Sequence, residues 1–309
     1  MVYKYENNLN YIYLRMSEIR KLKHLKISDD VFNTEGLMLI LNKKNKTKDG
    51  RRMLFKYLDL QEIPSVMERK ESILTYLNSS PYKDLEELVI PDTEIFVDGE
   101  AAGFAMPLIE NHKNVGHLLH SRDVSFQEKK KYLKQLGDLI DTVNRVDAKH
   151  EFLFGDLNEF NFILDEEEKM RAIDLDSCHI ANLDGIEPPD MAYYLLKNKN
   201  LWALPNKYKR TMLGVLIPNQ DSDLYSYLMI LINSLAHHDM FKEDIDTYFE
   251  YLEYLKGLGV PNELIEMLWN IYTPKKNENP RLLIDELDDH LIYNSSFNHF
   301  QKKKERMKP

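Results

Sequence analysis

The alternation of apolar and polar positions divides the chain into a strand-rich first third and a helical remainder. Short apolar runs bounded by polar or glycine-containing turns predict strands in the first 108 residues. These runs cover residues 37–41, 53–58, 89–91 with 94–97, and 102–108. Residues 11–27 carry both helix-like and strand-like features. Pro64 is well placed to open a helix that runs to Asn78. The pattern therefore predicts a small, mostly antiparallel sheet with one helix.

Beyond Pro107 the apolar positions recur at helical spacing. The clearest helix runs from Ser125 to Val146, where Ser125 and Glu128 form the capping-box pattern. Further helices are predicted at residues 221–235, 244–258, 262–271 and 281–291, with a long loop at 186–205. A strand-rich lobe at 1–108, a helical lobe at 109–296 and a basic, solvated tail at 297–309 follow from this pattern. A cleft is expected at about residues 107–112.

Composition narrows the possible functions. The chain has 309 residues and a net charge of −10, which argues against non-specific binding of nucleic acid. Its single cysteine, Cys178, cannot form an internal disulfide, and we expect it to be a small buried apolar residue. The N-terminus lacks the apolar segment of a signal peptide, and no apolar run approaches the ~18–20 residues of a membrane span. We therefore expect a cytoplasmic protein that binds neither membranes nor nucleic acid.

The stretch from Phe154 to Cys178 carries the candidate chemistry. Asp156 is followed five residues later by Asn161, and a short apolar run then leads through a charged turn to a second acidic position, Asp174. This layout predicts a strand, a hairpin turn and a second strand, with oxygen ligands at its mouth. Upstream, Lys56 is a single cation within an apolar strand.

The order of these motifs resembles that of the protein kinase superfamily over about 225 residues. The resemblance implies an α+β, bilobal protein-kinase-like fold with a small β-rich N-lobe and a larger helical C-lobe. The segment Gly155–Asn161 is similar to the catalytic loop of the Rio atypical kinases. Residues 174–177 and 103–107 look closer to a group of bacterial atypical Ser/Thr-kinase-like proteins, which we favour.

The resemblance also implies a role for each matching residue. Asp156 would be the base that orients the attacking hydroxyl, and Asn158 would contact substrate or phosphate. Asn161 and Asp174 would hold Mg²⁺, with Mn²⁺ as a possible substitute, because both metals prefer hard oxygen ligands. Lys56 would bind the α- and β-phosphates of ATP.

The same comparison assigns the surroundings of the nucleotide. The helix glutamate that pairs with the strand lysine would be Glu71 or, failing that, Glu68. Asp223 would brace the catalytic loop from the start of a C-lobe helix. The remaining nucleotide contacts would be Gly36, Met106, Pro107, Ile109 and Ile163.

Several positions depart from the family pattern. Only Gly36 remains of the glycine-rich loop, and Leu54 stands where a small residue usually covers the adenine. Asp176 replaces the glycine of the Asp-Phe-Gly motif, and Gly155 replaces the arginine that usually precedes the base. The family's Ala-Pro-Glu motif is not recognisable. These departures leave the substrate class open.

The sequence therefore leaves three candidate functions. The favoured one is an atypical Ser/Thr protein kinase that uses ATP and Mg²⁺ to phosphorylate a protein hydroxyl. The second is a small-molecule kinase of the aminoglycoside or choline phosphotransferase type, whose substrate would be a small hydroxyl compound. The third is a pseudokinase scaffold, suggested by Leu54 and by the loss of glycines.

Overall fold

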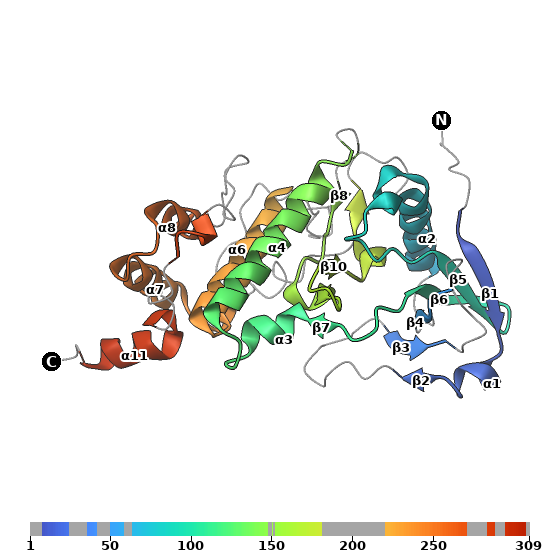
Figure 1. Cartoon of the computed structure of the whole chain (residues 1–309), viewed down its shortest axis with the longest axis horizontal. Coiled ribbons are helices and arrows are strands. Elements are labelled where there is room, and N and C mark those ends of the chain that lie inside the picture. The colour runs from blue at the N-terminus through green and yellow to red at the C-terminus, as the bar shows by residue number, and fades with distance from the viewer. Residues whose placement is uncertain are drawn as a thin grey trace.

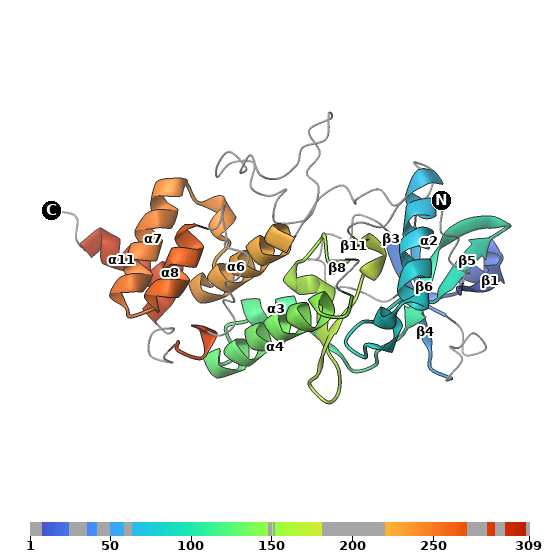
Figure 2. The same ribbon diagram turned by 90° about the horizontal axis from the view of Figure 1, so that it is seen from above.

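The computed structural model describes residues 8–24, 36–41, 50–58, 64–147, 150, 152–180, 220–270, 283–287 and 294–306. The protein is an α+β structure in which an N-terminal mixed sheet with one long helix precedes a mostly helical part (Figure 1). The two parts lie at opposite ends of a roughly bilobal molecule, as Figure 2 shows from above. The loop predicted at 186–205 lies outside the described residues.

The N-terminal sheet has six strands in the order β1-β5-β6-β4-β3-β2. Their bounds are β1 Asn10–Leu14, β2 Lys23–His24, β3 Gly36–Ile40, β4 Met53–Leu58, β5 Thr93–Val97 and β6 Glu100–Pro107. The strands predicted at 37–41, 53–58, 94–97 and 102–108 are confirmed. The sheet is mixed because β1 pairs with β5 in parallel. The ambiguous residues 11–27 contain part of β1, the short helix α1 (Met16–Ile19) and β2.

One predicted strand segment is wrong. Residues 89–91 lie in no strand, and the Val89 N–H instead donates to the carbonyl of Ala172 at 2.9 Å. The backbone there is satisfied by the hairpin of the second lobe rather than by a neighbour in the sheet. This contact connects the sheet to the segment that carries the acidic residues.

The two faces of the sheet pack differently because side chains alternate along each strand. Met53 and Phe55 of β4 point into a small core shared with Ile95 of β5. Leu58 points the other way, into the main core, where it is joined by residues of helix α2 (Pro64–Ser79). Lys56 shares the alternation of Leu58, so its side chain leaves β4 on the face that α2 covers. The apolar stripe of α2 confirms the helix predicted from Pro64.

The C-terminal part is built around two long helices, α4 (Phe126–Asn144) and α6 (Gln220–Ala236), which lie side by side (Figure 1). The predicted capping box of α4 is confirmed, because the Ser125 hydroxyl accepts from the Glu128 N–H while the Glu128 carboxylate accepts from the Ser125 N–H. This part also contains α3 Val115–His120, α7 Ile245–Gly257 and α8 Asn262–Trp269. Of the helices in the described ranges, none has both the length and the apolar character needed to cross a membrane.

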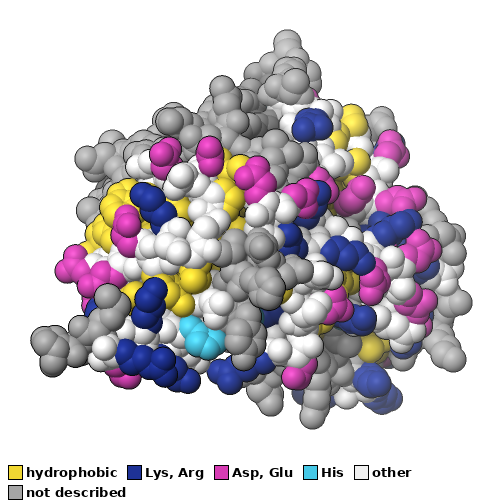
Figure 3. All heavy atoms as spheres, turned by 60° about the vertical axis from the view of Figure 1, so that its left-hand side comes forward, with side chains coloured by type: hydrophobic (Ala, Val, Ile, Leu, Met, Phe, Trp, Pro, Cys, Tyr) yellow, Lys and Arg dark blue, Asp and Glu magenta, His cyan; other side chains and the backbone are white. Residues whose placement is uncertain are grey.

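The basic residues at the end of the chain are exposed, as predicted, but they belong to a packed helix rather than to a tail. Residues 297–306 form helix α11, whose Phe297 and Phe300 are buried against Tyr251 of α7. The spacing of the two phenylalanines places both on one helix face, and burial of such side chains stabilises by about 1.5–3 kcal/mol each. The lysines lie on the exposed side, and Figure 3 shows Lys and Arg side chains gathered along the lower edge of this end of the molecule.

Candidate functional site

The stretch from Phe154 to Cys178 forms the predicted hairpin. Strands β9 (Phe162–Leu164) and β10 (Met170–Ala172) pair antiparallel, and β7 (Lys113–Asn114) extends them to a three-stranded sheet. Strand β8 (Phe152–Leu153) precedes this hairpin and pairs with β11 (His179–Ile180). The segment that joins β8 to β9 carries Asp156, and the turn after β10 carries Asp174.

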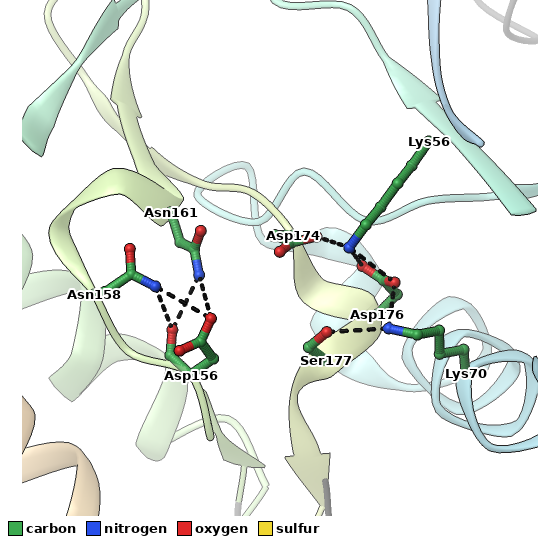
Figure 4. A network of polar contacts seen from close by, with 8 residues as sticks. All are labelled: Lys56, Lys70, Asp156, Asn158, Asn161, Asp174, Asp176 and Ser177. Atoms are coloured by element: carbon green, nitrogen blue, oxygen red, sulfur yellow. Dashed lines mark hydrogen bonds and ion pairs between the residues drawn. The ribbon is translucent and has the colours of Figure 1, made fainter. Parts of the chain in front are cut away.

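Asp156 is fixed by two asparagine side chains. The Asn158 amide donates to the Asp156 carbonyl and carboxylate oxygens, both at 3.2 Å. The Asn161 amide donates to the same two groups at 3.0 and 3.3 Å. The amide oxygen of Asn161 consequently points away from Asp156, as Figure 4 shows. The Asp156 carboxylate is held in a defined orientation by the two amides.

The loop is braced from helix α6. The Asp223 carboxylate, which is almost fully buried, accepts from the Phe154 N–H at 2.8 Å, and the bracing contact predicted for Asp223 is thereby confirmed. On the other side, the Asn114 amide donates to the Phe160 carbonyl at 2.8 Å. Hydrogen bonds to a charged acceptor are the stronger kind, so the backbone ahead of Asp156 has little freedom.

Asp174 lies next to Asn161 and adopts a strained backbone conformation. Its φ and ψ of 63° and 37° fall in the left-handed region, which costs a residue other than glycine about 1 kcal/mol or more. The N–H of the preceding Ile173 donates to the Asn161 carbonyl at 2.9 Å, which ties the two segments together. Strain of this kind persists where the surrounding structure imposes it, and it is a common feature of functional sites.

Two lysines and two aspartates, Asp174 among them, form one charged group (Figure 4). Lys56 reaches from β4 to contact the Asp174 carboxylate closely, and both oxygens of Asp176 lie 3.3 Å from its ammonium. Lys70 reaches from α2 to Asp176 at 2.7 Å and to the Ser177 hydroxyl at 3.1 Å. The two lysines and Asp176 are at most 2% exposed, whereas the side chain of Asp174 is 23% exposed. Asp174 is therefore the member of the group that a ligand can reach.

The pKa values of Asp174 and Asp176 are shifted in opposite directions by their surroundings. Burial raises the pKa of Asp174 to about 7, a rise that Lys56 opposes and the charge of Asp176 reinforces. Burial also acts to raise the pKa of Asp176, but Lys56 and Lys70 outweigh it and hold this pKa below its usual range. Asp176 is thus the more acidic of the two carboxyl groups, and Asp174 is the one that takes up a proton more readily.

Of the residues predicted to contact a nucleotide, Met106 lies on the same face of the sheet as Lys56, whereas Pro107 pairs with Met53 of the opposite face. Leu54 points to the face of Lys56, is partly exposed, and stands opposite Met106 on β6. Gly36 pairs with Leu58, two residues beyond Lys56 along β4. Ile163 alternates with Phe162 and Leu164, which point into the main core, so it projects from the opposite side of β9. Pro107 ends β6, and the carbonyl of Ile109 lies 2.6 Å from Nδ1 of His112.

The glutamates of α2 lie in different surroundings. Glu71 is partly buried and raises the pKa of Glu94 on β5, which places its charge close to that strand. Glu68 is exposed. The pairing of either glutamate with Lys56 stays a prediction.

Lys70 is the site residue that sequence reasoning missed. The family pattern directs attention to a glutamate in this helix, and a lysine is seldom fully buried. A signal was nevertheless present, because Lys70 follows Met67 by three residues and precedes Leu74 by four, and so occupies the apolar stripe of α2.

The metal-binding capacity of the site rests on two oxygen donors. Within the described ranges no three His, Cys, Asp or Glu side chains form a metal-binding group. The amide oxygen of Asn161 and the carboxylate of Asp174 are nevertheless suited to Mg²⁺, which commonly takes one or two protein oxygens and completes its shell with phosphate and water.

No protein-family model matches the chain, and no curated protein matches its sequence. The functional interpretation therefore rests on the geometry and chemistry of the site.

Proposed function

We propose that the chain is an ATP- and Mg²⁺-dependent phosphotransferase, and that it is an atypical Ser/Thr protein kinase acting on a protein hydroxyl. The observation that carries this proposal is the contact between Lys56 and Asp174, which are 118 residues apart in the sequence. It brings a strand cation to a carboxylate that lies beside Asn161, whose amide in turn holds Asp156. A phosphate-binding cation, two metal ligands and a base thus lie along one continuous network.

Each residue has a defined task in this proposal. Asp156 orients the acceptor hydroxyl and takes its proton, and the two amides that donate to it keep its carboxylate in place. Asn158 acts through this hydrogen bond, since its amide is already directed at Asp156. Asn161 and Asp174 would hold Mg²⁺, which supplies charge neutralisation at the phosphates. Lys56 would exchange its contact with Asp174 for the α- and β-phosphates.

The arrangement of elements supports a protein-kinase-like fold as part of the proposal. A mixed sheet with α2 on one face precedes a short connection after Pro107, and the helical part follows. The face of the sheet that carries Lys56 also carries Leu54, which is partly exposed, and Met106, which is buried. The connection that follows Pro107 would bring Ile109 to the edge of this face.

A pseudokinase scaffold is the second candidate, and two observations favour it. The ammonium of Lys56 is already engaged with both aspartates, and Leu54 projects onto the surface where a base would lie. Under this alternative the charged network would be a structural device that joins the two lobes, and no phosphate would be transferred.

Measurements of phosphoryl transfer and of nucleotide binding distinguish the kinase from the pseudokinase scaffold. The purified chain is incubated with γ-labelled ATP and Mg²⁺, first with general protein substrates and then with a panel of small hydroxyl compounds. We expect label on protein, and a loss of about 100-fold or more in Asp156→Asn, since a general base contributes about 10²–10⁴-fold. The exposed Asp84→Asn is the matched control and should transfer label normally.

Each contrary result has a distinct meaning. Equal transfer by Asp156→Asn would remove Asp156 from the mechanism. Turnover with a small hydroxyl compound alone would make the chain a small-molecule kinase. Binding of Mg-ATP without any transfer would favour the scaffold. If Mg-ATP at a concentration expected to add about 2.7 kcal/mol of stability leaves the melting temperature unchanged, the proposal fails.

A further inference from the structure

The Lys70 ammonium is a buried cation to which the proposed reaction assigns no task. It lies in the middle of α2, is 1% exposed, and contacts the Asp176 carboxylate at 2.7 Å and the Ser177 hydroxyl at 3.1 Å. Burying an ammonium is costly unless it is paired with a carboxylate and hydrogen-bonded. Asp176 supplies that carboxylate and is itself fully buried.

The two lysines relate to Asp176 differently. Lys70 makes the shorter contact, at 2.7 Å, whereas Lys56 lies 3.3 Å from both oxygens of Asp176 and also contacts Asp174 closely. Lys56 therefore divides its charge between two carboxylates. Lys70 directs its ammonium to Asp176 and to the neighbouring hydroxyl. Figure 4 shows Lys56 between the two aspartates and Lys70 on the far side of Asp176.

This arrangement matters when an anionic ligand attracts Lys56. If Lys56 moves to a phosphate, Asp176 loses one of its two cations while it remains buried. With Lys70 in place the carboxylate keeps its closer partner, so the departure of Lys56 leaves no uncompensated charge. Without Lys70, Asp176 would depend on Lys56 alone and would hold it back, because an unpaired buried charge is strongly unfavourable.

We propose that Lys70 is a positioning residue, a fixed counter-ion of Asp176 that frees Lys56 to leave the two aspartates and bind the phosphates of a nucleotide. This role rests on the proposed function of the site. The same contact fastens α2 to the turn that carries Asp174, because Asp176 and Ser177 belong to the short helical turn at Leu175–Ser177. Lys70 thus acts through Asp176 and does not itself touch the nucleotide.

Charge-balanced substitutions test this role. Lys70→Met keeps the length of the apolar stem and removes the charge, whereas Lys70→Met/Asp176→Asn removes both members of the pair and keeps Lys56 with Asp174. Asp176→Asn alone completes the double-mutant cycle. The exposed Lys83→Met is the matched control for loss of a lysine from the N-terminal lobe. Two quantities are measured for each variant: the Kd for ATP with and without Mg²⁺, and the urea midpoint of unfolding.

Lys70→Met should raise the Kd for ATP about tenfold or more and lower the urea midpoint, since a tenfold change corresponds to about 1.4 kcal/mol and breaking a buried pair costs more than that. The double variant should bind ATP within about threefold of the wild type, because Asp176 no longer retains Lys56. Its urea midpoint should lie above those of both single variants. Lys83→Met should leave both quantities unchanged.

Two results would overturn the role of Lys70 while leaving the proposed function intact: unchanged ATP binding by Lys70→Met, or a double variant that binds as weakly as Lys70→Met. A wild-type chain that fails to bind ATP would instead overturn the proposed function and, with it, this role. If Lys70→Met does not fold, the Kd of the double variant for ATP tests the role of Lys70 by itself. Binding within about threefold of the wild type supports the role, and a tenfold loss refutes it.

Discussion

Glu94 offers a test of the N-terminal lobe that is independent of any ligand. It lies in β5 and is only 5% exposed, between Tyr11 of β1 and Phe104 of β6 in the register of the sheet. Burial, reinforced by the charge of Glu71 on α2, raises the pKa of Glu94 from 4.5 to about 7. Folding therefore favours the neutral form of this carboxyl at slightly acidic pH.

The raised pKa of Glu94 makes the free energy of unfolding depend on pH. The folded state binds a proton that the unfolded state has released, so Glu94 makes the protein less stable as the pH rises from about 4.5 to about 7. A rise of the pKa from 4.5 to about 7, at about 1.4 kcal/mol for each pH unit, sets an upper value of roughly 3.5 kcal/mol. Local relaxation around a charged Glu94 reduces it, and about 1–3 kcal/mol is expected.

Glu94→Gln removes the titration and keeps the shape of the side chain. Urea unfolding at pH 5 and pH 8 should show the variant gaining about 1–3 kcal/mol over the wild type at pH 8 and less than about 1 kcal/mol at pH 5. Glu68→Gln, an exposed position on α2, is the matched control and should show no comparable gain. A gain that is the same at both pH values, or absent at pH 8, would refute the reasoning.

Three further predictions concern the supports of the site. Gly103→Ala should lower the free energy of unfolding by about 2 kcal/mol or more, because a Cβ there would lie 2.0 Å from the Lys56 carbonyl at a φ of +139°; an unchanged denaturant midpoint would contradict this. Asp223→Asn should cost about 1–3 kcal/mol in urea unfolding by weakening the acceptor of the Phe154 N–H, and it should reduce phosphoryl transfer more than ATP binding. Because burial raises the pKa of the Cys178 thiol, native protein should react with a thiol reagent only after unfolding, and rapid reaction of the folded chain would contradict that burial.

The elements that depend on local sequence could be predicted, and those that depend on distant partners could not. The apolar run 53–58 and the capping box at Ser125 carry their own signals, and both elements formed as expected. The parallel pairing of β1 with β5 joins residues about 80 positions apart, and the five residues of β1 give no indication of its partner. Helix α11 was missed because its lysines dominate its composition, although Phe297 and Phe300 have helical spacing.

In the candidate site, too, the residues that form a pattern along the chain could be predicted, and the pairing of distant residues could not. The order of Asp156, Asn161 and Asp174 could be recognised because it is a pattern along the chain. The pairing of Lys70 with Asp176 could not, because it joins residues 106 positions apart and depends on how α2 lies over the hairpin. A buried lysine can be understood only together with the carboxylate that neutralises it.

Asp176 replaces the glycine of the family pattern, and this replacement supplies a buried carboxylate that pairs with Lys70 and Lys56. A glycine at this position would remove the carboxylate that both lysines contact, so that Lys56 would keep Asp174 and Lys70 would lose its partner at 2.7 Å. With Asp176 present, the described group contains two lysines and two aspartates, and every charge has a partner. Under the proposed function the count is preserved on binding: phosphate takes Lys56, the metal ion takes Asp174, and Lys70 keeps Asp176. Under the proposed function, Asp176, which departs from the expected motif, would thus hold Lys56 in place without ligand and allow it to move to a bound phosphate.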